Sequence, residues 1–429
     1  MKRARLLVLA ATISMLGWGS ILPYQYAYAA QTRGWGGLVA AGAASLFSIG
    51  ALAAAPIGGR LADRCNPARV AVVAKLVAAA ATAFLIIAET PALFLAGMFV
   101  FGAGITAAQP AQTVLVLRWV GSQDRRRVFA LLFTGSSVGM AIGAFTAGYL
   151  VDLTVIDGLW PAFAVATIGF LISAGLIGIA GRGAPSDEVP APQDAPSAAA
   201  GSAIRAILST PALRWTAVIT VMLALGFYAQ FESGLPAYAI TVLGVSARTI
   251  GTASAVNCLV IVALQMAVVK WTAKRSAPSL LVVVGSIWVL SWLLLAATSL
   301  VPELAGTMFV VVFGVFAVGE TMYAPVLNPL TASLAPAGMV GTTLGIFAAL
   351  QTGVSAVGPL LAGIALGAGH GSLFVGVHVG ISLVAVFAAL RLRSLLAGAR
   401  ASQRGGIPTT LEDLVDEAEA GDLRAPQVA

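Results

Sequence analysis

The chain has 429 residues, of which 59% are hydrophobic and only 10% carry a charge. Soluble proteins average roughly 25% charged residues, so this chain cannot build the polar surface that a water-soluble domain needs. Its 47 glycines follow no triplet period and it has only two cysteines, which excludes collagen-like and disulfide-scaffold proteins. Lipid must therefore solvate most of the chain, which leaves membrane enzymes, channels and transporters as candidate classes.

Twelve apolar stretches of the chain are each long enough to cross a membrane as a helix. A bilayer core of about 30 Å requires about 20 apolar residues in helical form. These stretches lack the polar–apolar alternation of a membrane β-strand, so the predicted fold class is an all-α integral membrane protein with twelve transmembrane helices. The predicted spans are residues 6–28, 37–59, 70–89, 92–117, 128–151, 159–180, 214–240, 247–269, 279–298, 305–330, 339–367 and 371–392.

Positive charges gather in alternate loops. One set of loops holds clusters such as Arg60, Arg64 and Arg69, whereas the opposite loops hold only Arg33 and Arg248. Cytoplasmic loops carry the excess of lysine and arginine, so both termini are predicted to lie in the cytoplasm, with the chain in a bacterial-type plasma (inner) membrane. The net charge of +7 is explained by this topology, and the scattered cations without interleaved aromatic residues argue against nucleic-acid binding.

The middle of the chain divides the spans into two equal sets. Residues 181–213 are rich in Gly, Pro, Ser and Ala, a composition typical of a disordered linker. Gly104 recurs as Gly319 at a shift of 215 residues. Gly143 recurs as Gly358 at the same shift, which predicts two pseudo-symmetric six-helix bundles, a known transporter plan. The predicted domains are an N-terminal bundle over 1–180, the cytoplasmic linker 181–213, a C-terminal bundle over 214–393 and a cytoplasmic tail over 394–429.

The loop between the second and third spans reads Gly-Arg-Leu-Ala-Asp-Arg over residues 59–64. This sequence, followed by a basic residue and an apolar helix start, resembles the loop 2–3 signature of the major facilitator superfamily. Gly59 is predicted to let the second helix approach a neighbour closely. Asp63 is predicted to accept from backbone N–H groups or to pair with Arg64 or Arg69. The resemblance implies that these four residues form a cytoplasmic gate.

The signature is incomplete further along the loop. Asn66 stands where glycine is usual, and Pro67 and Ala68 stand where basic residues are usual. Asparagine tolerates left-handed backbone, so the turn can survive with a thinner network of charges. The resemblance covers the chain from about residue 6 to 393 and implies the twelve-helix fold of a secondary transporter.

A glycine repeat marks the fifth span. Gly135, Gly139 and Gly143 lie four residues apart, so they share one helix face and are predicted to permit tight helix packing. The pattern partly resembles the glycine-rich antiporter motif of the superfamily's drug:proton exporters, with Gly139-Met140 in place of the usual Gly-Pro. Those exporters usually carry a membrane-embedded arginine in the fourth span, and residues 98–104 hold none. That difference counts against the best-known machinery of proton exchange.

Two glutamates interrupt apolar spans at depth, where ionisable residues are costly and usually functional. Glu320 in the tenth span and Glu232 in the seventh are the predicted proton-coupling residues, and Glu320 is the stronger candidate. A carboxyl group in a poorly hydrated cavity can take up and release protons, or it can bind a cationic substrate. Alternatively, polar neighbours satisfy Glu320, and Glu232 lies near the outer mouth. Lys75, a turn or two inside the third span, is expected to reach the cytoplasmic face and to have no chemical role.

Aromatic rings and amide groups on several spans suit a bulky, mainly apolar ligand. The predicted substrate-cavity residues are Trp18, Tyr24, Gln25, Gln109, Gln112, Tyr228, Gln230, Tyr323, Asn328 and Gln351. His370 and His378 lack the partners and spacing of a catalytic or metal site, and the sequence contains no phosphate-cradling Gly-Lys-Ser/Thr motif. Neither an enzyme nor an ATP-driven pump is predicted.

The sequence therefore predicts a monomeric secondary transporter that exports a small hydrophobic or amphipathic compound by alternating access, driven by a proton gradient. Its expected partners are the lipid bilayer and this small molecule, without a metal or another cofactor. The missing arginine in the fourth span supports an alternative, an uncoupled facilitator or an importer of a small nutrient. A rival of another class is a non-transporting sensor or assembly partner that uses the tail.

Overall fold

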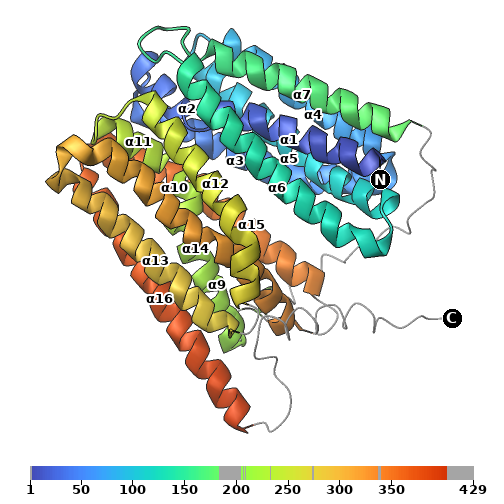
Figure 1. The fold of residues 1–429 in the computed structure, drawn as a ribbon, viewed down its shortest axis with the longest axis vertical. Coiled ribbons are helices and arrows are strands. Elements are labelled where there is room, and N and C mark those ends of the chain that lie inside the picture. Colours follow the sequence, from blue (N-terminus) through green and yellow to red (C-terminus); the bar gives the residue numbers. More distant parts are fainter. Residues whose placement is uncertain are drawn as a thin grey trace.

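The computed structural model describes residues 2–182, 204–205, 207, 209–231, 233–272, 275–336 and 340–402. Twelve helices or helix series in this part of the chain are long and apolar enough to cross a membrane, which confirms the predicted fold class. Figure 1 shows them in two groups, one blue to green and the other yellow-green to red. Most of the predicted linker and all of the tail after residue 402 lie outside the described residues.

The first group, called here the N-half, contains six spans. Several of its helices begin with proline at a first-turn position, where the missing N–H costs no hydrogen bond. The helices of the N-half are α1 (Lys2–Ile21) with α2 (Gln25–Ala27) and the π-helical turn η1 (Tyr28–Thr32), then α3 (Gly36–Arg64), α4 (Pro67–Ile86), α5 (Pro91–Trp119), α6 (Ser122–Leu150) and α7 (Trp160–Gly181).

The second group, the C-half, contains the other six spans, and its first span, Pro211–Phe231, is divided into three short elements. A π-helical turn inserts an extra residue per turn and is frequently found at functional sites. The elements of the C-half are α9 (Pro211–Leu223), η2 (Ala224–Tyr228, π-helical), α10 (Ala229–Phe231), α11 (Gly234–Thr241), α12 (Ala247–Thr272), α13 (Ala277–Ala297), η3 (Thr298–Leu300), η4 (Pro302–Leu304), α14 (Ala305–Leu334), α15 (Val340–Gly367) and α16 (Gly371–Ser402).

The two halves repeat the same glycine contacts. Gly143 on α6 presses on the backbone of α1, and Gly358, its equivalent on α15, presses on Ala229 of α10. A Cβ atom added to either glycine would overlap these neighbours. Equivalent glycines thus bring equivalent helices into contact, as expected of a pseudo-symmetric pair of bundles.

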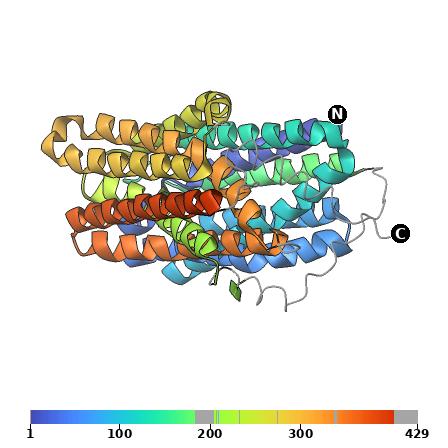
Figure 2. The same cartoon turned by 90° about the horizontal axis from the view of Figure 1, so that it is seen from below.

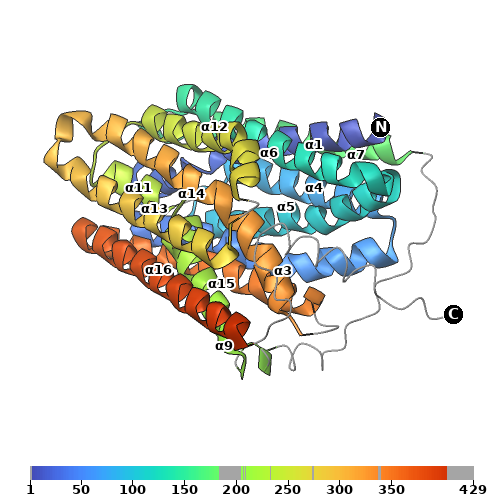
Figure 3. The same cartoon turned by 60° about the horizontal axis from the view of Figure 1, so that its bottom comes forward.

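The halves meet at one end of the molecule and diverge toward the other (Figure 1). They are joined through α6 with α12 and α3 with α15, and Figure 3 shows α12 beside α6. Seen from below, the red and orange helices of the C-half lie on one side and much of the blue and teal N-half lies on the other (Figure 2). We call the meeting end the closed end and the end that carries the N-terminus the linker end.

Close packing seals the closed end. The Tyr24 hydroxyl donates a hydrogen bond of 2.6 Å to the Ala144 carbonyl of α6, and the same hydroxyl touches Gly251 of α12. The guanidinium of Arg248 on α12 lies 4.5 Å from the centre of the Tyr149 ring on α6. The contacts of Tyr24 with Gly251 and of Arg248 with Tyr149 cross from one half to the other, so they must break if the closed end is to open.

Candidate functional site

A carboxylate stands inside the C-half. Glu320 lies in the middle of α14 and is partly buried. The amide of buried Asn257 on α12 donates to its Oε2 at 3.5 Å, and the Tyr228 hydroxyl at the end of η2 also hydrogen-bonds to it. Three elements therefore converge on one ionisable group, and two donors stabilise its charged form.

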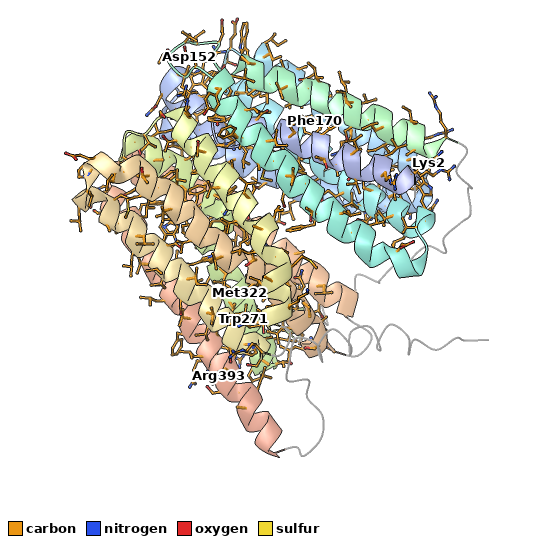
Figure 4. The ribbon with its side chains drawn as sticks, viewed as in Figure 1. Lys2, Asp152, Phe170, Trp271, Met322 and Arg393 are labelled. Atoms are coloured by element: carbon orange, nitrogen blue, oxygen red, sulfur yellow. The ribbon has the colours of Figure 1, made fainter. Side chains whose placement is uncertain are left out.

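Aromatic rings surround this carboxylate on the C-half side. Tyr228 packs 5.3 Å from the Tyr323 ring and 6.2 Å from the Trp288 ring, measured between ring centres. Trp288 is fully buried, donates to the Phe316 carbonyl at 3.1 Å, and lies against Gly319, the residue before Glu320. Met322, labelled in Figure 4, marks this region of α14. The carboxylate thus has an apolar, rigid wall, which limits the water that can screen its charge.

A lysine inside the N-half corrects one sequence-based expectation. Lys75 does not reach the surface: its side chain is only 2% exposed. Its Nζ donates to the Ser14 hydroxyl of α1 at 2.6 Å and lies 5.5 Å from the centre of the Phe170 ring, which Figure 4 labels within the N-half. Lys75 follows Ala68 and Ala71 and precedes Ala78 on a stripe spaced three or four residues apart, and that stripe faces the bundle interior.

A cavity of about 320 Å³ borders Lys75. Gln109 and Gln112 of α5 also line it, and the Gln112 Nε2 is buried without a hydrogen-bond partner among the described residues. Phe133 of α6, another lining residue, is 55% exposed. The cavity therefore combines nitrogen donors on one side with apolar side chains on the other. Of the predicted cavity residues, Gln109 and Gln112 come together here.

Other predicted cavity residues occupy the packed interior. Trp18 stacks on Phe47 with ring centres 4.3 Å apart, and Tyr24 and Gln25 are fully buried. Trp18 is enclosed by Phe47 of α3 and Phe101 of α5, and the Tyr24 hydroxyl is hydrogen-bonded to α6. In this structure these three residues belong to the helix packing and do not border the Lys75 cavity.

The C-half residues of that prediction are divided between three environments. Tyr228 and Tyr323 lie together beside Glu320, as described above. Gln230 is fully buried and its amide donates to the Gly358 carbonyl at 3.4 Å. Asn328 is exposed and Gln351 is partly buried. Glu232, the second proton-coupling candidate, lies outside the described residues, so its role stays a prediction.

The predicted gate lies at the linker end, and one of its proposed contacts is misplaced by a residue. A Cβ added to Gly59 would meet nothing within 4 Å, whereas one added to Gly58 would lie 2.6 Å from the Ala107 carbonyl of α5. The close approach is therefore made by Gly58. Arg64, the last residue of α3, and Arg69 in the first turn of α4 are exposed, and the Asp63 side chain lies outside the described part.

The unusual residue of the gate loop has a clear local function. Asn66 caps α4, and its Oδ1 accepts from the Ala68 and Arg69 amides at 2.9 and 3.4 Å. Its φ of −63° is ordinary extended backbone, so the turn requires no left-handed residue at this position. Asparagine is among the preferred N-cap residues, which explains why it can replace glycine here.

The glycine repeat of the fifth span faces α1. A Cβ added to Gly135 would meet the Thr12 hydroxyl, one on Gly139 would meet the Thr12 carbonyl, and one on Gly143 would meet the Leu16 carbonyl. Backbone carbonyls cannot move aside without bending a helix, so Gly139 and Gly143 are required for this contact, whereas the Thr12 side chain beside Gly135 can rotate.

Sequence reasoning undervalued Asn257 and assigned Lys75 no role. The signal for Lys75 was present, since its position is in phase with the alanine stripe of α4 and that stripe indicates an inward face. Asn257 lies within an apolar run, where a buried amide usually has a specific partner. Neither pattern identifies the hydrogen-bond partner, because Ser14 of α1 and Glu320 of α14 are far from Lys75 and Asn257 in the sequence.

The chain matches known proteins in its sequence. A family model for the Major Facilitator Superfamily matches residues 7–359. Multidrug resistance protein MdtH of Yersinia pestis (strain Pestoides F) is 28% identical over 142 residues, which are 33% of this chain and 34% of that protein. MdtH of Yersinia pseudotuberculosis serotype O:1b (strain IP 31758) gives the same values. The match thus spans about a third of the length of these curated relatives.

Solved structures agree in fold over nearly the whole chain. The nucleoside transporter NupG has a TM-score of 0.72 at 13% identity, covering 91% of this chain and 99% of its own. Tetrameric PepTSo2 has a TM-score of 0.68 at 15% identity, covering 94% of this chain and 99% of its own. At such identities the likeness shows the fold alone. Because the family model extends over most of the residues, the chain belongs to the Major Facilitator Superfamily of membrane transporters.

Proposed function

We propose that this protein is a secondary transporter that exports a small hydrophobic or amphipathic compound in exchange for protons. The observation that carries the proposal is Glu320, an ionisable group partly buried in a membrane-spanning helix and held by Asn257 and Tyr228. Such groups in transporters mark proton or substrate pathways. The similarity to MdtH, a multidrug resistance protein by name, supports an amphipathic compound as the cargo.

The orientation follows from the positive-inside rule. The linker end carries Arg64, Arg69 and Arg275, and the closed end carries Arg33 and Arg248 alone among the described basic side chains. We therefore assign the linker end, with both termini, to the cytoplasm of a bacterial plasma membrane. Since the halves diverge toward that end, the structure corresponds to an inward-open state (Figure 1).

Glu320 is linked through Asn257 to the contact between α6 and α12, so its protonation state can affect the interface between the halves. The contact between α6 and α12 reaches Cys258, which packs in a small cluster with Ala141 of α6. Cys258 follows Asn257, the donor to Glu320. A proton on Glu320 removes the charge that Asn257 and Tyr228 solvate, so it weakens the hold of α12 and η2 on α14. Alternate binding of proton and substrate would then favour opposite states of the closed end.

The test is transport into everted membrane vesicles with an imposed pH gradient, acidic inside, followed with radiolabelled 1-naphthaleneacetate, an amphipathic weak acid that does not accumulate passively in an acidic lumen. Because Gln cannot exchange a proton, Glu320→Gln is expected to lower gradient-driven uptake at least about tenfold. Glu303→Gln, at an exposed acid in η4, is the matched control and should transport like the unmodified protein. Full gradient-driven uptake by Glu320→Gln would refute the coupling assignment, and Glu232→Gln would then become the variant to measure.

The second candidate function is uncoupled facilitation or import of a small nutrient. Residues 98–104 of the fourth span contain no arginine, and two solved structures with the same fold are nucleoside and peptide transporters. Proteoliposomes containing a pH-sensitive dye separate the two functions. Substrate-induced proton movement supports the exchanger, and substrate flux without any proton movement supports the facilitator.

A further inference from the structure

A second charged group in the membrane-spanning part has no role in the proposed proton coupling. Lys75 lies eight residues after Pro67, the first residue of α4, and its side chain is 2% exposed. Burying an ammonium group away from water is costly, and unpaired charges of this kind persist mainly where function requires them. The N-half therefore contains a cation whose presence needs an explanation.

The hydrogen-bonding capacity of this cation is largely unused. An ammonium group has three N–H donors, and the structure gives it one acceptor, the Ser14 hydroxyl at 2.6 Å. The Phe170 ring, 5.5 Å away, offers a weak cation–π contact. Within the residues that the structure describes, no carboxylate forms an ion pair with Lys75. Two of its three N–H donors therefore stay available for an acceptor in the adjoining cavity.

The cavity beside Lys75 supplies the rest of a binding site. Gln112 is one of its lining residues, and the buried Nε2 of this side chain has no hydrogen-bond partner in the described part of the chain. The two unsatisfied groups are both donors, which favours an acceptor-only ligand group such as an ionised carboxylate. Met15, Leu132 and Phe133 line the same cavity and present apolar surface. A volume of about 320 Å³ lies within the range of small-molecule sites.

We propose that the Lys75 cavity binds the carboxylate of an amphipathic organic acid, with Lys75 and Gln112 as its donors and the apolar part of the molecule against α1 and α6. The proposal names the substrate class and so rests on the proposed transport function. It does not depend on the proton-coupling role of Glu320, because that residue belongs to the other half.

The experiment compares two nearly isosteric probes, 1-naphthaleneacetate and its neutral amide, 1-naphthaleneacetamide. Isothermal titration calorimetry with the full chain in lipid nanodiscs at pH 7 is expected to give a preference of about tenfold for the carboxylate, from one charge-assisted contact. Lys75→Met should reduce this preference to within about twofold by removing that contact. Lys270→Met, at an exposed lysine near the end of α12, is the matched control and should keep the full preference.

Several outcomes would overturn the proposal. Equal affinity of the unmodified protein for both probes would exclude a carboxylate site without reference to any variant, which covers the case of an unstable Lys75→Met protein. An undiminished preference in folded Lys75→Met would show that another group recognises the carboxylate. Gln112→Leu should weaken carboxylate binding several-fold, and unchanged binding would remove Gln112 from the site.

The same variants separate this proposal from the proton-coupling one. Glu320→Gln is expected to keep the carboxylate preference while losing gradient-driven transport. A missing carboxylate preference together with intact proton-driven transport would refute only the substrate class. A clear preference together with transport that ignores the pH gradient would refute only the coupling.

Discussion

The two halves share a backbone plan but hold opposite charges in different ways. In the C-half, Gly319 packs against the large Trp288 indole, and the neighbouring Glu320 receives two hydrogen bonds from separate elements. In the N-half the equivalent Gly104 packs against Ala78, one turn from Lys75. The cavity beside the cation is lined by side chains of α1, α5 and α6, whereas the indole packs beside the carboxylate. The repeat therefore preserves the helix contacts but not the side chains. The C-half has a carboxylate, Glu320, with two hydrogen-bond donors, and the N-half has a lysine, Lys75, beside a cavity.

The largest expected effect tests whether the two halves depend on the same glycine contacts. Gly143→Ala and Gly358→Ala should each lower the apparent unfolding temperature by several degrees, because the added methyl groups overlap the Leu16 carbonyl and Ala229. Overpacking of this kind costs about 1–3 kcal/mol. Intrinsic tryptophan fluorescence during heating in detergent measures the change.

The control for this pair is Gly175→Ala on the outer face of α7, where an added Cβ meets nothing within 4 Å. Alanine is the better helix former by about 1 kcal/mol, so this variant should unfold at the same or a higher temperature. If Gly143→Ala lowered the unfolding temperature and Gly358→Ala did not, the C-half would not repeat the packing of the N-half.

The architecture was largely predictable from the sequence, because membrane spans are determined by local composition. Runs of about 20 apolar residues fix the number of helices. The glycine spacing of the fifth span identified the face that contacts α1, since residues four apart share a helix face. These inferences need only neighbours along one helix.

The site was predictable only in part, because its contacts join residues from distant helices. Glu320 stood out as an acid in an apolar run, but its donor Asn257 comes from another helix. Lys75 was misread because a lysine near a helix end can extend to the surface or turn inward, and the choice depends on Ser14 of α1. The same limit applied to Gly58 and Gly59, where only the position of α5 decides which glycine is pressed.

A smaller effect tests whether the hydrogen bond from Asn257 to Glu320 serves transport or only joins two helices. Asn257→Leu should slow gradient-driven transport about tenfold, because a carboxylate that loses a donor releases its proton less readily. Gln265→Leu is the matched control, since the Gln265 amide also joins α12 to α14 but donates at 3.3 Å to the Thr321 carbonyl. Equal losses in the two variants, measured in everted vesicles, would mean that Asn257 only holds the helices together.

The smallest effect concerns the closed end, where the halves meet without either charged site. Arg248 on α12 faces the Tyr149 ring across the interface at 4.5 Å, and this exposed contact is worth about 0.5–1 kcal/mol. Arg248→Met should therefore shift the population away from the inward-open state by about two- to fivefold. Arg33→Met is the control, because Arg33 contacts Tyr28 and Trp35 within the N-half alone.

Spin-label distance measurements can follow this shift with labels attached through Gly121→Cys and Ser276→Cys, which lie at the linker end of the two halves. The native thiols Cys65 and Cys258 are replaced by serine beforehand. The inward-open state gives the longer distance, so Arg248→Met should add weight to the shorter one. An unchanged distribution, or an equal change in Arg33→Met, would mean that the closed end is held by backbone packing at Gly251 and Ala144 and that the cation–π pair is incidental to it.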